Sequence, residues 1–274
     1  MAGDSHARVR GVDLAVSDAG VGAPFFWGHG FASSRAQESE GALLDFDALA
    51  ARHRVVRWDA RGHGASGGGA DPLESRWDNL ALDLLALATA LGVERFVAGG
   101  VSMGAAVALH AAAHESHRIA GLVLVLPPTA YETRAAQAAD YCAAADLVER
   151  EGVERYVEQV NAQPTPEILR AFAAGLRFSP AIPAPSLPAT LRGAAASDLP
   201  PVESVRALRL PALILAWDTD PGHPLSTAEQ LAELLPAADL HVARRLRDVT
   251  TWTRLVDDFL AHTPEGDATS ASAR

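Results

Sequence analysis

The chain has 274 residues, 49% of them hydrophobic, and is therefore long enough to bury the core of one large domain. Its formal net charge of −11 disfavours nucleic acid and anionic membranes as partners. All 23 basic residues are arginine, which excludes a lysine nucleophile, and the single cysteine, Cys142, excludes an internal disulfide.

Along the chain, strand-like and helical segments alternate. Continuous apolar runs predict buried strands, and leucines at helical spacing predict a helix with one face on a sheet. The expected strands are 12–16, 24–27, 54–58, 96–98, 122–126, 212–216 and 240–243, and the expected helices are 80–91, 103–114, 227–235 and 252–262. This order predicts an α/β fold with a mainly parallel sheet of about eight strands and helices on both faces.

One long segment breaks the alternation. Helices are expected near 133–159 and 165–175, and a proline-rich loop follows them. The segment is too long for a simple connection between two elements of the sheet. We therefore expect residues 1–126 and 202–274 to form the core, and residues 127–201 to form an inserted helical cap over the carboxyl edge of the sheet.

The pentapeptide Gly100-Val101-Ser102-Met103-Gly104 lies between an expected strand and an expected helix. A sharp strand-to-helix turn strains the serine backbone, and glycine on either side avoids collisions with the neighbouring strand and helix. Such a turn lifts the hydroxyl of Ser102 above the sheet, at the positive end of the next helix. The sequence context therefore predicts a nucleophile elbow.

Two further motifs follow expected strands. The sequence H-G-F occupies residues 29–31, directly after the strand 24–27, and D-A-R-G-H-G-A-S occupies residues 59–66, directly after the strand 54–58. With these motifs and the elbow in this order and spacing, the chain resembles the α/β-hydrolase superfamily over nearly its whole length.

The resemblance assigns roles to some of these residues. It implies an oxyanion hole made by the backbone N–H groups of Phe31 and Met103, of which the second follows the nucleophile directly. The histidines of the two other motifs, His29 and His63, are interpreted as residues that brace loops through hydrogen bonds.

The acid of a catalytic triad is expected after the strand 212–216, where the chain reads W-D-T-D-P-G-H-P over residues 217–224. The family pattern of an aspartate followed closely by proline points to Asp220 and leaves Asp218 as a surface or turn residue. The alternative role of Asp220 is to cap a turn with its side chain.

The catalytic base departs from the family pattern. The family places its histidine between the last strand and the last helix, but residues 243–252 contain none, and Asp248 stands at the corresponding position. Without a base, serine is a weak nucleophile. The best candidate is His223, oriented by Asp220 or by Asp248. The other histidines after Asp220 are interpreted as packing or surface residues: His241 and His262.

These residues favour a serine hydrolase that acts on a small apolar carboxylic ester, lactone or thioester through an acyl-enzyme at Ser102. Haloalkane dehalogenases and epoxide hydrolases of the same family carry aspartate at the elbow, so the serine argues against both. Two alternatives stay open. One is a non-hydrolytic enzyme such as a lyase or isomerase. The other is a catalytically degenerate protein that binds a small molecule or a protein.

No metal-ligand cluster, phosphate loop or dinucleotide motif occurs in the sequence, so no cofactor and no metal are expected. The expected partner is a small-molecule substrate, with neither nucleic acid nor membrane, and a homodimer remains open. Because the first residues contain no apolar signal segment and no apolar run approaches ~18 residues, we expect a cytoplasmic protein.

Overall fold

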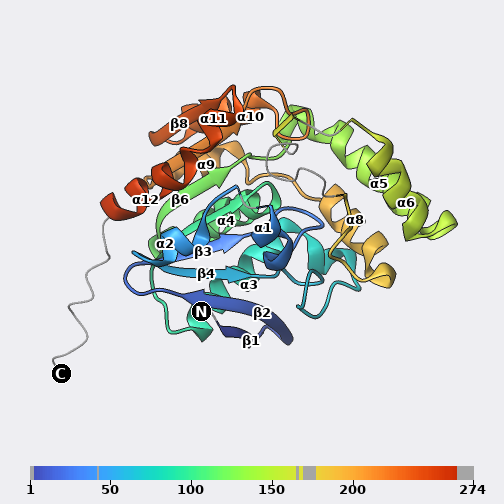
Figure 1. Ribbon diagram of the computed structural model, residues 1–274, viewed down its shortest axis with the longest axis horizontal. Coiled ribbons are helices and arrows are strands. Elements are labelled where there is room, and N and C mark those ends of the chain that lie inside the picture. Colours follow the sequence, from blue (N-terminus) through green and yellow to red (C-terminus); the bar gives the residue numbers. More distant parts are fainter. Residues whose placement is uncertain (1–2, 42, 165–166, 169–176, 264–274) are drawn as a thin grey trace.

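The computed structural model describes the chain except for residues 1–2, 42, 165–166, 169–176 and 264–274. The strands are β1 (Gly3–Val9), β2 (Val12–Ala19), β3 (Pro24–Gly28), β4 (Arg54–Trp58), β5 (Phe96–Val101), β6 (Ile119–Val125), β7 (Pro211–Trp217) and β8 (Ala237–Ala243). The predicted fold class is confirmed, because these eight strands form one sheet in the order β1-β2-β4-β3-β5-β6-β7-β8 (Figure 1). The strands β1 and β2 pair antiparallel, β2 pairs antiparallel with β4, and all other pairs are parallel.

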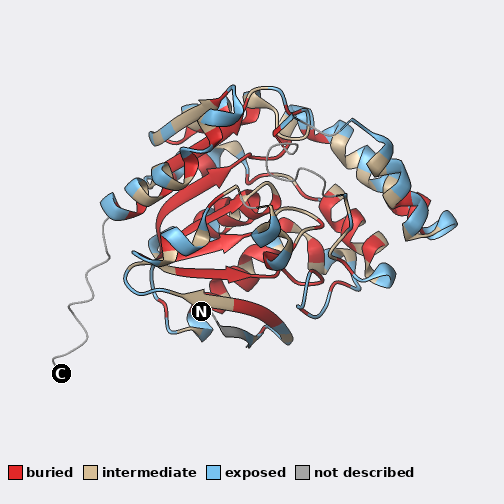
Figure 2. Cartoon of the chain, in the orientation of Figure 1, coloured by how far each residue is buried: buried red, intermediate tan, exposed pale blue. Residues whose placement is uncertain are grey.

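Helices cover both faces of this sheet, whose central strands are buried (Figure 2). The helices are α1 (Arg35–Glu40), α2 (Phe46–Ala50), α3 (Trp77–Ala90), α4 (Met103–His114), α5 (Arg134–Glu151), α6 (Val153–Ala162), α8 (Leu187–Ala195), α9 (Val202–Ala207), α10 (Leu225–Leu234), α11 (Leu246–Val249) and α12 (Trp252–His262). Within a strand, alternate residues face opposite sides. Phe26 of β3 therefore packs in the cluster that includes α3, α4, α9 and α10, whereas Phe25 packs in the cluster that includes α2, α11 and α12.

The segment between β6 and α9 forms a third apolar cluster, apart from the sheet. Helices α5, α6 and α8 contribute buried residues such as Ala145, Tyr156 and Leu191, and Ala32 from the loop after β3 joins them. Gly152, at a φ of 90°, separates α5 from α6. The helix expected at 165–175 lies largely outside the described residues. These helices stand together at one side of the sheet (Figure 1).

Besides the short helices α1, α2, α9 and α11, two longer elements were not expected from the sequence. Strand β1 was not predicted, because its sequence G-D-S-H-A-R-V is mostly polar; as an edge strand, it pairs only with β2. Helix α8 was not predicted either, because the segment was interpreted as a proline-rich loop. Pro188 stands in the first turn of α8, where the missing N–H of proline costs no helical hydrogen bond.

Across the described ranges, no helix combines the length and the apolar character that a bilayer span requires.

Candidate active site

Ser102 lies at the tight turn between β5 and α4. Its backbone has φ 54° and ψ −112°, a conformation that L-residues seldom adopt. Both flanking positions require glycine because strand β3 lies too close for a side chain. A Cβ on Gly104 would overlap the carbonyl group of Gly28 in β3, and a Cβ on Gly100 would lie 2.6 Å from the carbonyl oxygen of Gly28. Strand β3 therefore presses directly against the elbow.

The two backbone N–H groups expected to form the oxyanion hole belong to Met103, which precedes Gly104 in the elbow, and to Phe31, which follows β3. Met103 is the first residue of α4, so its backbone N–H has no acceptor within the helix. Its side chain is buried in the core and does not line the pocket. Phe31 follows β3 at the carboxyl edge of the sheet and lines the same pocket as Ser102.

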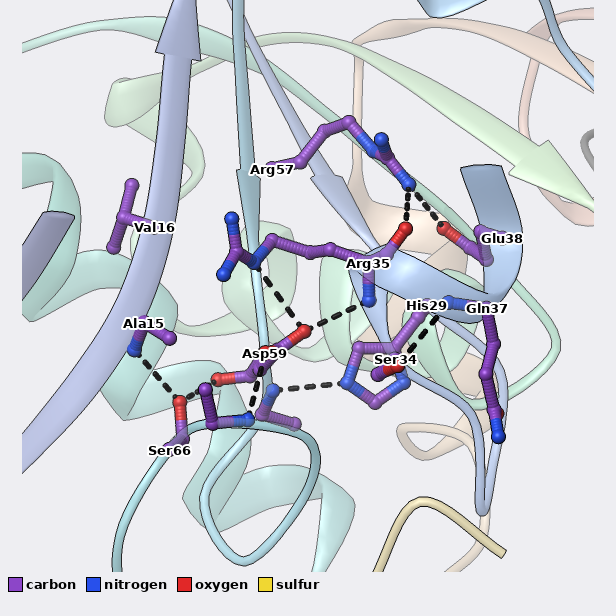
Figure 3. A network of polar contacts seen from close by, with 12 residues as sticks. Ala15, Val16, His29, Ser34, Arg35, Gln37, Glu38, Arg57, Asp59 and Ser66 are labelled. Atoms are coloured by element: carbon purple, nitrogen blue, oxygen red, sulfur yellow. Dashed lines mark hydrogen bonds and ion pairs between the residues drawn. The ribbon is translucent and has the colours of Figure 1, made fainter. Parts of the chain in front are cut away.

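A buried carboxylate holds the loop after β3 against the loop after β4 (Figure 3). Asp59 accepts hydrogen bonds from the backbone N–H of Arg35 at 2.8 Å and of Ala65 at 3.0 Å. The hydroxyl of Ser66 donates to the carbonyl of Asp59 at 2.6 Å and accepts from the N–H of Ala15 at 2.8 Å. These contacts fix the position of the loop that carries Phe31.

The motif histidines occupy bracing positions rather than the pocket. His29 Nε2 accepts a hydrogen bond from the N–H of Ala60 at 2.9 Å, so its proton lies on Nδ1, which donates to the carbonyl of Gly30 at 2.7 Å. His63 Nδ1 lies 3.0 Å from the carbonyl of Arg61. Burial lowers the pKa of His29, and it lowers the pKa of His63 to about 3, so both rings are neutral.

A chain of two hydrogen bonds joins Ser102 to an acid. The Oγ of Ser102 lies 2.8 Å from Nε2 of His223, and Nδ1 of the same ring lies 2.8 Å from Oδ2 of Asp220. An ionised carboxylate only accepts hydrogen bonds, so Nδ1 carries the proton and Nε2 is free to accept from the serine hydroxyl. The arrangement can remove a proton from Ser102.

The loop after β7 shapes both members of the acid–base pair. Asp220 Oδ1 accepts from the N–H of Gly222 at 2.9 Å, so the carboxylate also caps the turn that presents His223. Burial alone would raise the pKa of Asp220, but the hydrogen bonds from His223 and Gly222 lower it below its usual value. Asp220 is therefore ionised at neutral pH.

Asp248 does not reach this site. Its Oδ2 accepts from the backbone N–H groups of Arg244 at 3.1 Å and Arg245 at 3.0 Å, which caps the short helix α11. Of the two aspartates considered for orienting His223, the structure thus places Asp220 beside the ring and Asp248 in a capping role. The remaining candidate histidines have other partners: His241 contacts Asp239, and His262 contacts the carbonyl of Asp258.

Replacing Asp248 by alanine is expected to lower the free energy of unfolding by about 0.5–1 kcal/mol, since only a partly exposed helix cap is lost. Catalytic activity should stay within about twofold of the wild type. Chemical denaturation and an esterase assay measure the two quantities. The matched variant Asp220→Ala should instead abolish most activity. A large loss of activity in Asp248→Ala would contradict the capping role.

Ser102 and His223 open into a pocket of about 350 Å³. One part of its wall is apolar and includes Trp27, Leu43, Leu44 and Phe46. The polar lining residues are Ser33, Gln37, Glu38, Ser102, Thr129, Arg134, Gln137, Tyr141, Asp220 and His223. Sequence reasoning missed Glu38 and Arg134, because neither belongs to a motif and only the fold brings α1 and α5 over the elbow.

The match to a known family agrees with this geometry. Residues 24–164 match the family described as alpha/beta hydrolase fold, and the chain belongs to that family. No curated protein matches the sequence.

Solved structures of the same fold differ in activity. A thermophilic esterase from Thermogutta terrifontis, solved with malate bound, is 24% identical at a TM-score of 0.74, covering 96% of this chain and 99% of that one. An enol-lactonase from Burkholderia xenovorans LB400 is 20% identical at a TM-score of 0.77, covering 94% and 100%. Epoxide hydrolases from metagenomes of hot environments provide a match at 18% identity and a TM-score of 0.75, covering 96% and 99%. At these identities the likeness establishes the fold alone.

Proposed function

We propose that the protein is a serine hydrolase that cleaves small carboxylic esters, lactones or thioesters through an acyl-enzyme. The observation that carries the proposal is the uninterrupted hydrogen-bonded chain from Ser102 through His223 to Asp220, with both contacts at 2.8 Å. A serine at the elbow fits the activities in the names of the esterase and the enol-lactonase better than that of the epoxide hydrolases.

The reaction proceeds in two steps, acylation of Ser102 and hydrolysis of the acyl-enzyme. His223 Nε2 takes the hydroxyl proton while Ser102 Oγ attacks the substrate carbonyl carbon, and the N–H groups of Phe31 and Met103 stabilise the oxyanion. When the carbon–oxygen or carbon–sulfur bond to the leaving group breaks, the imidazolium returns its proton to that group. Water, deprotonated by the same Nε2, then attacks the acyl-enzyme, and the carboxylic acid leaves while Ser102 regains its proton.

The acyl-enzyme itself provides the test. With p-nitrophenyl butyrate, the wild type should release p-nitrophenolate, and intact-protein mass spectrometry of a rapidly quenched reaction should find one butyryl group per chain. Ser102→Ala should lose the label, and its turnover should fall by roughly 10⁴- to 10⁶-fold. Replacement of the exposed Ser116 by alanine is the control and should change neither. A wild type that binds the ester without turnover or label would indicate a degenerate binding protein.

A further inference from the structure

One arginine in the pocket wall carries a buried charge without a contacting carboxylate. Arg134, the first residue of α5, is only 5% exposed. Its guanidinium donates from Nε to the carbonyl of Ser197 at 2.6 Å, from Nη1 to the hydroxyl of Thr129 at 3.2 Å, and from Nη2 to the carbonyl of Ala194. The ring of Trp77 lies 4.3 Å from its central carbon. All of these partners are neutral.

The charge of Arg134 is only partly compensated within the described residues. No described carboxylate forms an ion pair with it, although Asp198 attracts it from farther away. The carboxylate of Asp198 is already committed to the backbone N–H groups of Tyr131 at 3.0 Å and Leu199 at 2.7 Å. Burying a cation without a contacting anion is costly, so a ligand that brings an anion gains from this site.

Arg134 shares its pocket with Ser102 and His223. Among the lining residues, it supplies the one permanent positive charge, and Thr129, Gln137 and Tyr141 add polar groups beside it. The apolar wall around Trp27 and Phe46 completes a pocket that suits a small molecule with one charged group and one apolar part.

Two carboxyl groups line the pocket, and neither one would repel an anion bound at Arg134 strongly. Asp220 is paired with His223, and Glu38 has partners of its own. Its Oε2 accepts from the indole N–H of Trp27 at 3.0 Å and lies 3.5 Å from Nη2 of Arg57, so its negative charge has a cation of its own. Burial raises the pKa of Glu38 to about 7, which further reduces its charge at neutral pH.

We propose that Arg134 and Thr129 form an anion subsite, and that the natural substrate is an ester or lactone bearing a carboxylate. This inference rests on the proposed hydrolase function. Arg134 is a specificity-determining residue, since it selects the charged substrate and takes no part in the proton transfers at Ser102. A guanidinium is well suited to this role because its planar donors match the geometry of a carboxylate.

The wild type gives the first test, with two pairs of substrates that differ only in charge. One pair places the charge in the acyl group: mono-p-nitrophenyl glutarate and its carboxamide counterpart. The other places it in the leaving group: 4-acetoxybenzoate and 4-acetoxybenzamide. In at least one pair, kcat/KM for the anion should exceed that for the amide by about 10- to 100-fold, and added salt should reduce the difference. Equal values in both pairs would overturn the inference and leave the proposed hydrolase intact.

Substitutions then test whether Arg134 causes the preference for the anionic substrate. Arg134→Met should abolish the preference for the anion, so that kcat/KM for the anion falls to the value for the amide, and Arg134→Lys should retain part of the preference. Arg192→Met removes an arginine from α8 that pairs with Asp146 and Glu149 outside the pocket, so it should leave the preference unchanged. Equal loss for both substrates in Arg134→Met would indicate a structural role only and overturn the inference.

A binding measurement distinguishes failure of the anion subsite from failure of the proposed hydrolase function. Isothermal titration of the Ser102→Ala protein with glutarate, and with glutaramide as the neutral control, measures the subsite without turnover. Binding of glutarate that weakens at least tenfold in Ser102→Ala/Arg134→Met supports the subsite even if no ester is hydrolysed, in which case the proposed hydrolase function fails by itself. If Arg134→Met does not fold, the charge preference and salt dependence of the wild type decide. Glutarate and glutaramide binding equally would overturn the inference.

Discussion

His223→Ala is expected to lower kcat for a p-nitrophenyl ester by roughly 10⁴- to 10⁶-fold, by about the same factor as Ser102→Ala. Among the described residues, the imidazole at 2.8 Å is the only side chain hydrogen-bonded to the hydroxyl of Ser102, and Asp220 contacts only the far side of that ring. The double variant should be no slower than either single variant, since the two residues act as one unit.

The matched control is His241→Ala, which removes an imidazole bound to Asp239 on the edge strand β8 and should leave kcat unchanged. Steady-state kinetics of the wild type and the four variants, with folding checked by circular dichroism, measures these effects. A nearly active His223→Ala together with an inactive Ser102→Ala would mean that another group accepts the proton.

Gly104→Ala is expected to destabilise the protein by roughly 4 kcal/mol or more, which is a large part of the about 5–15 kcal/mol by which an ordinary domain is stable. Helix propensity alone predicts the opposite sign, because alanine in a helix is favoured over glycine by about 1 kcal/mol. The steric overlap outweighs helix propensity, because the new Cβ would overlap the backbone carbonyl of Gly28. Neither β3 nor α4 can move apart without opening the core.

Gly92→Ala is the control for this substitution. Gly92 has φ 69° and no atom within 4 Å of a Cβ placed on it, so the change should cost only the backbone strain of about 1 kcal/mol. Urea denaturation of both variants measures the difference. A Gly104→Ala protein as stable as the wild type would contradict the close contact between β3 and the elbow.

Elements with a strong local pattern were predicted well from the sequence. The apolar strand β4 (Arg54–Trp58) and the last helix α12 (Trp252–His262) appear with the expected bounds, and the elbow stands between β5 and α4 as expected. Elements without such a pattern were missed. The polar edge strand β1 has only one neighbour to pair with, and α8 starts within a proline-rich segment.

The sequence by itself determined the fold class and the position of the strained serine, because hydrophobic periodicity and glycine spacing act over a few residues. For the base, the sequence offered His223 as the best of several histidines that follow Asp220, but it could not place that ring beside the serine. His223 stands 121 positions from Ser102 in the sequence. Only the order of strands β5, β6 and β7 in the sheet brings their carboxyl ends to one edge, where His223 meets Ser102. The same holds for Arg134: its charge can be read from the chain, but its burial beside the pocket arises from tertiary packing of α5 over the elbow.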